Sequence, residues 1–195
     1  FFLQTAHTTY GMRVMETGHL EHLYYGERIT VDAQDSASCA PLVIQRAFAP
    51  GNTCTYDKEH PQISMEDICL EVGTLGKGDI REPFLEVRFA DGSVTSDFTF
   101  DSYEVITLME REQCLQDSGL PHSYSETETD SAECLQIVLQ DVTNRLELQL
   151  LYTVFEECDV ITRSARLINH SDASVTLERC LSAQLDLTED YSVIT

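Results

Sequence analysis

The 195-residue chain is predicted to fold as an all-β protein, a large antiparallel β-sandwich (a supersandwich of the galactose-mutarotase-like kind) with at most short helical turns. Apolar and polar residues alternate with a period of two along several segments, as half-buried strands require. Turn-forming residues separate these segments at the spacing typical of sandwiches. No internal repeat or linker interrupts the pattern, so residues 1–195 are assigned to a single domain.

The N-terminal half contains the first strand signals. Residues 9–14 have the composition of a strand, and Ser64-Met65-Glu66-Asp67 favours one short helical turn, since Ser is a good N-cap and carboxylates favour the positive end of a helix. Residues 84–89 and 94–100 flank Ala90-Asp91-Gly92-Ser93. An Asp-Gly pair between alternating apolar segments is a strong hairpin signal, so these two segments are predicted to pair.

Two further hairpins are predicted in the C-terminal half. They join residues 135–140 to 146–150 through the turn 141–144, and residues 160–168 to 175–181 through the loop 169–173. Between the two halves lies the polar segment 113–133, which contains Gly119 and Pro121 and is predicted to be a long exposed loop.

The charge of the chain limits its partners. Lys and Arg number 12 against 34 Asp and Glu, which gives a net charge of −22. Such a charge repels phosphate backbones and anionic lipids, so neither a nucleic acid nor a membrane surface is expected as a partner. The first residues lack a basic flank and a long apolar segment, and no stretch of eighteen apolar residues occurs, so no signal peptide or membrane span is expected.

The cysteines indicate a reducing compartment. All seven are scattered, the closest neighbours being 15 positions apart, so the Cys-x-x-Cys unit of zinc ribbons and redox motifs is missing. An odd, scattered set suits reduced thiols, several of them serving as small core residues. A cytoplasmic location is therefore expected, with no metal and no cofactor.

Three motifs in the sequence resemble functional sites. His19 and His22 resemble half of a metal site, but their spacing brings them to one face only on a helix, and the flanking residues favour strand or turn. Gly76-Lys77-Gly78 is only a fragment of a phosphate-binding fingerprint and is better explained by positive-φ turn positions. Glu156 and Glu157 resemble the carboxylate pair of a glycosidase, but the chain has 34 acidic residues, so such pairs arise by chance. The chain also has no Trp, the residue that commonly forms the flat platform of a sugar site.

Three segments, taken together, resemble the N-terminal domain of the microbial α-galactosidases of glycoside hydrolase family 36. They are residues 17–26, preceded by the strand-like 9–14; residues 76–83; and residues 152–155, followed by 159–166. Two segments depart from the usual pattern of the family: Glu71-Val72-Gly73 stands where Glu-Tyr-Pro is usual, and Ile80 stands where Phe is usual.

The resemblance implies a chain that carries no catalytic residue of its own. It implies a β-supersandwich followed by a (β/α)8 barrel, which would hold both catalytic aspartates, and a small C-terminal β domain. The whole enzyme would be a retaining glycosidase, often a homo-oligomer, acting on galactosides such as melibiose and raffinose. The partners of this chain would then be its own barrel and neighbouring subunits, and apolar patches that the barrel covers would be exposed on the isolated chain.

Asp79 and Arg81 are the candidate site residues. Two positions apart in an extended segment, they would point the same way. One possibility is a salt bridge that holds the turn. The resemblance implies another, because N-terminal loops of the relatives reach the substrate pocket of an adjacent subunit, and the two residues would then line the rim of that pocket.

Other functions stay open from the sequence. An independent carbohydrate-binding module is the main alternative, since eight Tyr residues can supply sugar platforms in place of Trp. A sandwich without any sugar ligand is a second alternative, and an α-N-acetylgalactosaminidase of the same clan is a third. Fold alone does not choose among these functions.

Overall fold

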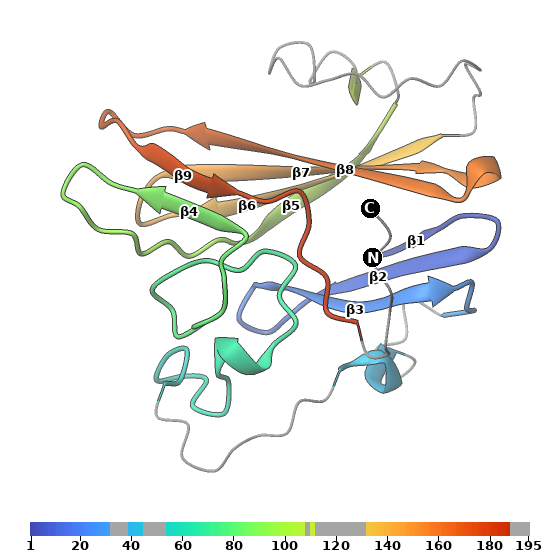
Figure 1. Ribbon diagram of the computed structural model, residues 1–195, viewed down its shortest axis with the longest axis horizontal. Coiled ribbons are helices and arrows are strands. Elements are labelled where there is room, and N and C mark those ends of the chain that lie inside the picture. The colour runs from blue at the N-terminus through green and yellow to red at the C-terminus, as the bar shows by residue number, and fades with distance from the viewer. Residues whose placement is uncertain (32–38, 45–53, 108–109, 112–131, 188–195) are drawn as a thin grey trace.

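The structure is a computed structural model that describes residues 1–31, 39–44, 54–107, 110–111 and 132–187 (Figure 1). Its strands form a three-stranded sheet in the order β1 (Phe2–Gln4), β2 (Thr8–Val14), β3 (Leu20–Glu27), and a four-stranded sheet in the order β5 (Thr99–Ile106), β6 (Glu133–Asp141), β7 (Leu146–Phe155), β8 (Val160–Asn169). β4 (Leu85–Arg88) pairs with β9 (Thr176–Cys180). The described residues also form the 3-10 helices η1 (Ala40–Leu42), η2 (Met65–Asp67) and η3 (Glu156–Cys158).

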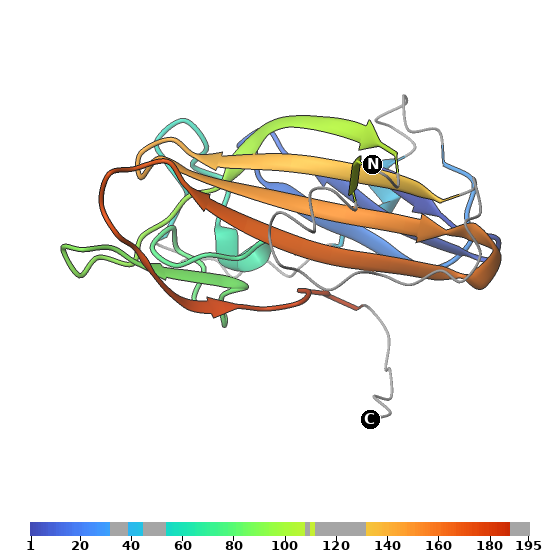
Figure 2. The ribbon, with the colours of Figure 1, turned by 90° about the horizontal axis from the view of Figure 1, so that it is seen from above.

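The predicted all-β antiparallel fold is confirmed. Every pair of neighbouring strands in the three sheets is antiparallel. Figure 1 shows the three-stranded and four-stranded sheets as two layers, and Figure 2 shows the same layers from above. The predicted extent of the domain, residues 1–195, stays a prediction.

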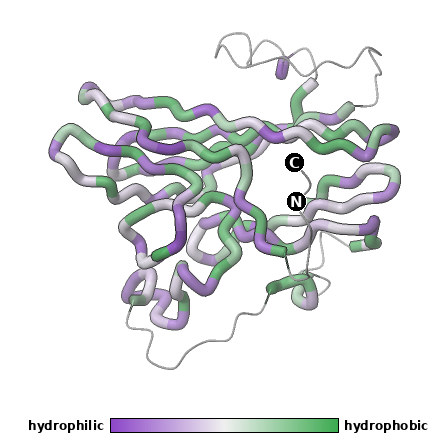
Figure 3. Tube along the Cα trace, viewed as in Figure 1, coloured by the Kyte–Doolittle hydropathy of each residue, from purple (hydrophilic) through white to green (hydrophobic). Residues whose placement is uncertain are grey.

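The core lies between the layers and is built by strand alternation. Leu146, Leu148 and Leu150 of β7 are all buried, with polar Glu147 and Gln149 between them. Figure 3 shows the same alternation of hydrophobic and hydrophilic residues along the strands. Residues of all three sheets join one hydrophobic cluster, which includes Met12, Phe84, Leu85, Val87, Ile137 and Leu139. Burying each such side chain stabilises the fold by roughly 1.5–3 kcal/mol.

One predicted hairpin is confirmed. β6 and β7 pair along their whole length, with Ile137 opposite Leu150 and Leu139 opposite Leu148. Asp141 makes the turn between them, because its carboxylate accepts hydrogen bonds from the Asn144 backbone N–H at 3.0 Å and from Asn144 Nδ2 at 2.6 Å. Strand β2 covers the predicted strand 9–14.

Two predicted hairpins are wrong. β4 does not pair with the segment after Gly92, and β8 does not pair with β9; instead β4 pairs with β9, and β5 pairs with β6. The turn at Asp91 does form, since the Asp91 carboxylate accepts from the Ser93 backbone N–H at 2.9 Å. Alternation determines which face of a strand is buried but not which strand lies beside it. The loop after β4 and the loop after β8 each cross from one sheet to another.

The remaining local predictions have mixed outcomes. Residues 65–67 form the predicted turn, η2, but Ser64 makes no side-chain cap, and its hydroxyl is buried without a hydrogen-bond partner among the described residues. Most of the predicted polar loop 113–133 lies outside the described residues. Cys69 and Cys134 are fully buried, as expected for core thiols, and no disulfide joins the described cysteines.

A clasp of polar contacts joins one end of the two layers. Asp159, at a left-handed φ of 52° after η3, accepts hydrogen bonds from Thr5 Oγ1 at 2.8 Å and from the His7 backbone N–H at 2.8 Å. The Ala6 backbone N–H donates to Glu156 O at 3.2 Å. The turn between β1 and β2 is thereby fastened to the turn between β7 and β8.

In the described residues, no helix has the length and apolar composition needed to cross a bilayer.

Candidate functional site

A fully buried carboxylate, Glu71, connects the two layers of the sandwich. Its backbone N–H donates to Leu20 O at 2.9 Å, which holds it beside β3. The Tyr10 hydroxyl, from β2, lies 2.8 and 2.7 Å from the two carboxylate oxygens and donates to them. The Tyr152 hydroxyl, from β7, donates at 2.6 Å. One carboxylate therefore holds a tyrosine from each layer.

Arg163 of β8 balances the charge of Glu71. Its Nη2 lies 3.4 Å from Glu71 Oε1 and donates to the Glu71 backbone oxygen at 3.1 Å. The guanidinium also lies 4.6 Å from the centre of the Phe84 ring, a cation–π distance. The Arg163 side chain is only 9% exposed, and its Nε has no hydrogen-bond partner among the described residues.

The protonation states in this cluster follow from burial and from the Glu71 charge. Burial, followed by the negative charge of Glu71, raises the pKa of both Tyr10 and Tyr152 well above the usual value, so both phenols stay protonated as donors. The His22 ring lies 5.0 Å from the Tyr10 ring, and its Nδ1 lies 3.8 Å from Glu71 Oε2. Burial lowers the pKa of His22 despite the opposing effect of Glu71, so His22 is neutral in the folded chain at pH 7.

The buried His22 makes stability depend on pH. Its pKa is lower in the folded than in the unfolded chain, so its contribution is complete above the unfolded value of 6.5 and is lost as the pH falls towards the folded value. The slope is at most about 1.4 kcal/mol per pH unit. We expect His22→Phe to reduce the fall in unfolding free energy between about pH 6.5 and 5, measured by urea titration. The exposed control His170→Phe should keep the wild-type fall; an unchanged His22→Phe profile would contradict the assignment.

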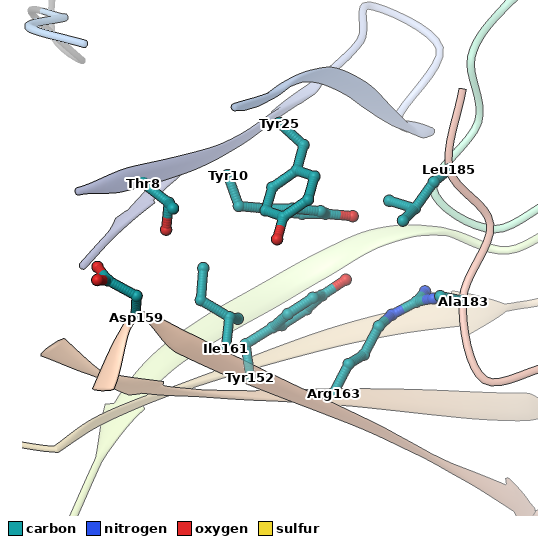
Figure 4. Close-up of a pocket in the computed structure, with 9 residues that line it drawn as sticks. All are labelled: Thr8, Tyr10, Tyr25, Tyr152, Asp159, Ile161, Arg163, Ala183 and Leu185. Atoms are coloured by element: carbon teal, nitrogen blue, oxygen red, sulfur yellow. The ribbon is translucent and has the colours of Figure 1, made fainter. Parts of the chain in front are cut away.

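A pocket of about 170 Å³ lies beside the Glu71 cluster. We call it the tyrosine pocket, and its polar and aromatic lining consists of Thr8, Tyr10, Tyr25, Tyr152, Asp159 and Arg163. Figure 4 shows Thr8 and Asp159 towards one end, Leu185 and Ala183 towards the other, and the tyrosine rings between. The tyrosine pocket thus offers flat rings together with donors and acceptors, which suits a small polar ligand with an apolar face.

The predicted site residues Asp79 and Arg81 pair with each other. Arg81 Nε and Nη2 donate to the two carboxylate oxygens of Asp79 at 2.8 and 2.9 Å, which makes a bidentate salt bridge. Arg81 Nη2 also donates to the backbone oxygens of Ile68 at 2.6 Å and Met65 at 3.1 Å. The pair therefore fastens η2 to the turn at residues 76–81, as a salt bridge that holds the turn would do.

The other motifs have structural partners. Gly76 and Gly78 adopt φ of 97° and 91°, which confirms them as positive-φ turn positions. Lys77 Nζ lies 2.9 Å from Asp97 Oδ2, and His19 Nε2 lies 3.0 Å from Asp97 Oδ1. Burial alone would raise the pKa of Asp97, but hydrogen bonds from His19 and Lys77 outweigh burial and lower that pKa to about 2.

The two histidines do not meet at a common site. His19 is held by Asp97, whereas His22 lies in the core beside Tyr10. Among the residues that the structure describes, no three His, Cys, Asp or Glu side chains are grouped as a metal ion would need. Glu156 and Glu157 are exposed in η3, and three acidic residues of the predicted loop lie outside the described residues: Glu126, Glu128 and Asp130.

The Glu71 cluster was not predicted from the sequence. Its members come from β2, β7, β8 and the segment before residue 72, so no local motif contains them. One available signal was a carboxylate between two apolar residues, Leu70 and Val72, a pattern that points to a buried and therefore paired charge. Tyr152 and Arg163 did fall within segments that carried the family resemblance.

Comparison with known proteins gives one consistent family. The model for the glycosyl hydrolase family 36 N-terminal domain matches residues 18–195. The bifunctional α-galactosidase/sucrose kinase AgaSK of Mediterraneibacter gnavus is 36% identical over 97% of this chain and 19% of the relative. The α-galactosidase AgaA of Geobacillus stearothermophilus is 32% identical over 100% of this chain and 25% of the relative.

Solved structures agree with this assignment. The crystal structure of the α-galactosidase from Lactobacillus brevis has a TM-score of 0.80 and 34% identity, covering 96% of this chain and 24% of that protein. A variant of Geobacillus stearothermophilus AgaA in complex with raffinose has a TM-score of 0.74 and 30% identity, covering 94% and 24%. The chain thus spans about a fifth to a quarter of its curated relatives, 19% and 25% for the two named above. It belongs to the glycosyl hydrolase family 36 N-terminal domain family.

Proposed function

We propose that this chain is the non-catalytic N-terminal domain of an α-galactosidase. The complete enzyme would hydrolyse terminal α-linked galactose from oligosaccharides such as melibiose and raffinose with retention of configuration. One observation carries the proposal: α-galactosidases match 97–100% of the chain, yet the chain accounts for only 19–25% of their length. We assign the reaction to the (β/α)8 barrel that the family resemblance implies after the sandwich.

The chemistry of hydrolysis supports this division. A retaining glycosidase needs two carboxyl groups about 5 Å apart, one as nucleophile and one as acid/base. Glu71 is unsuited to either role, since it is fully buried and already bound by Tyr10, Tyr152 and Arg163. The two catalytic carboxylates are therefore assigned to the barrel, and the sandwich is assigned a supporting role.

The C-terminal part of the described chain offers a surface for the barrel. Exposed large apolar side chains recur there, between 39% and 50% exposed: Val160, Leu177, Leu181, Leu185 and Leu187. Figure 2 shows β9 and the segment after it along one edge of the molecule. Such exposure is unfavourable in an isolated sandwich. We assign this edge to the rest of the enzyme, because the chain matches an N-terminal domain and covers only 25% of the length of AgaA.

Activity of matched proteins tests the proposal. We expect the complete gene product to release galactose from raffinose and melibiose, and the 195-residue chain to release none under the same conditions. Proton NMR of the first product formed should show the α-anomer, as retention requires. Release of galactose by the 195-residue chain, or none by the complete product, would refute the assignment.

We further propose that the Asp79–Arg81 pair positions residues 65–68 at the rim of the substrate pocket of an adjacent subunit. Arg81→Ala removes the donors to Met65 and Ile68, so kcat/KM for raffinose in the complete enzyme should fall roughly tenfold to a hundredfold. Arg88→Ala, at an exposed arginine of β4, is the control and should be silent. An unchanged kcat/KM with a lowered unfolding free energy would leave only the salt-bridge role.

Location and assembly complete the proposal. A cytoplasmic location is supported by the scattered, odd set of cysteines in the sequence. Homo-oligomeric assembly is supported by the family resemblance and is checked by size-exclusion chromatography with light scattering on the complete gene product.

A further inference from the structure

We infer that the tyrosine pocket binds one neutral sugar ring of the α-galactoside class. The choice of galactoside rests on the proposed function, whereas the choice of a neutral polyol rests on the pocket itself. The pocket volume of about 170 Å³ leaves room for a single ring.

Charge excludes ionic ligands from the pocket. An anion would meet Asp159 and the nearby Glu71 within a chain whose net charge is −22. For a cation, the attraction of Asp159 is offset by the positive charge of Arg163, since both side chains line the pocket. A purely apolar ligand would leave the Asp159 carboxylate and the Arg163 guanidinium with fewer hydrogen bonds than their oxygens and N–H groups can make. A neutral molecule with hydroxyl groups and an apolar face satisfies all these groups.

The unpaired Arg163 Nε is the second observation that points to a ligand. A buried N–H without an acceptor is rare in folded proteins and indicates a bound partner such as water or a ligand oxygen. A sugar hydroxyl can accept from the Arg163 guanidinium, which lines the pocket, and other hydroxyls can donate to the Asp159 carboxylate, which His7 and Thr5 hold in place. The apolar C–H face of a pyranose would lie against Tyr25.

The pocket is accessible from solvent. Tyr25 is 43% exposed, so the wall that its ring forms reaches the surface. Tyr10 and Tyr152 are buried and held by Glu71, which makes the floor of the pocket rigid. A preformed floor lowers the ordering cost of binding.

Titration of the isotope-labelled 195-residue chain with methyl α-galactoside tests the inference by protein-observed NMR. We expect saturable shifts at the amides of Ile161, Ala183 and Leu185, with a Kd on the order of 1 mM for a ligand of this size. Absence of saturable shifts at these amides up to about fifty times that Kd would overturn the inference. Equal affinity for methyl α-glucoside would overturn the galactoside assignment.

Three variants locate the site. Tyr25→Ala should weaken binding roughly tenfold, as loss of a large aromatic contact does. Ala183→Trp adds bulk to the lining and should also abolish the shifts, without removing any group of the pocket. Tyr103→Ala, which truncates another exposed tyrosine on β5, is the control and should bind as the wild type does. Weakening by Tyr103→Ala equal to that by Tyr25→Ala would refute the location.

The binding result is independent of hydrolysis. Binding is measured on the 195-residue chain, whereas the proposed function is measured as galactose release by the complete gene product. Galactose release without sugar-dependent shifts would refute the pocket alone. Saturable shifts without any galactose release would refute the enzyme assignment alone.

Discussion

Glu71→Ala is expected to lower the free energy of unfolding by about 3–5 kcal/mol, the cost of removing one partner from a buried ion pair. The substitution leaves the Arg163 guanidinium buried without its carboxylate. It also leaves the Tyr10 and Tyr152 hydroxyls without their acceptor. Because these groups belong to both layers, the loss is expected to affect the sandwich as a whole.

A double variant separates the charge from the hydrogen bonds. Arg163→Met in the Glu71→Ala background removes the unpaired cation, so the double variant should be more stable than Glu71→Ala alone. Glu104→Ala, at an exposed position of β5, is the control and should change stability by less than about 0.5 kcal/mol. Equilibrium unfolding in urea, followed by circular dichroism, measures all three. A loss below about 1 kcal/mol for Glu71→Ala would show that the cluster does not stabilise the fold.

Gly76→Ala is expected to lower the free energy of unfolding by roughly 2–5 kcal/mol, the sum of backbone strain and overpacking. Gly76 has a φ of 97°, which a residue with a side chain rarely adopts. An added Cβ would also clash with Thr95 Oγ1 and lie 2.7 Å from Thr95 Cβ, so the backbone or Thr95 must shift.

Gly92→Ala is the matched control for this effect. Gly92 has a similar φ of 86°, but an added Cβ would have no neighbour within 4 Å. Only the backbone strain of about 1–2 kcal/mol should therefore appear. The difference between the two variants, measured by urea unfolding, isolates the contact with Thr95. Equal losses would mean that Thr95 moves aside at no cost.

Local sequence information was sufficient for the β6–β7 hairpin and for the positive-φ glycines. Alternation with a period of two fixes the buried face of each strand, and a four-residue turn leaves few partners other than the adjacent strand. The same holds for Gly76 and Gly78, whose conformations follow from the absence of a Cβ. The all-β class followed from many such segments in sequence.

In the rest of the fold, which strand pairs with which depended on contacts between residues distant in sequence. The turn at Asp91 forms as predicted, yet residues 94–98 leave β4, and Phe98 is buried on the way to β5. β4 then pairs with β9, which starts at Thr176. Closing a long loop costs little more than closing a short one, whereas burying apolar faces in a common core is worth several kcal/mol. Core burial therefore outweighed the local hairpin signals.

The candidate site shows the same division. The Asp79–Arg81 pair could be proposed from two residues in one extended segment, and the structure places them in contact. The acid at residue 71 could be recognised as unusual, but its partners on β2, β7 and β8 could not, because they meet only when the two layers pack. The amino-acid sequence alone therefore specified most strands, several turns and the family. The buried charge cluster and the pocket beside it depend on the packing of one layer against the other, because a buried carboxylate needs hydrogen-bond donors and only that packing brings these donors to Glu71.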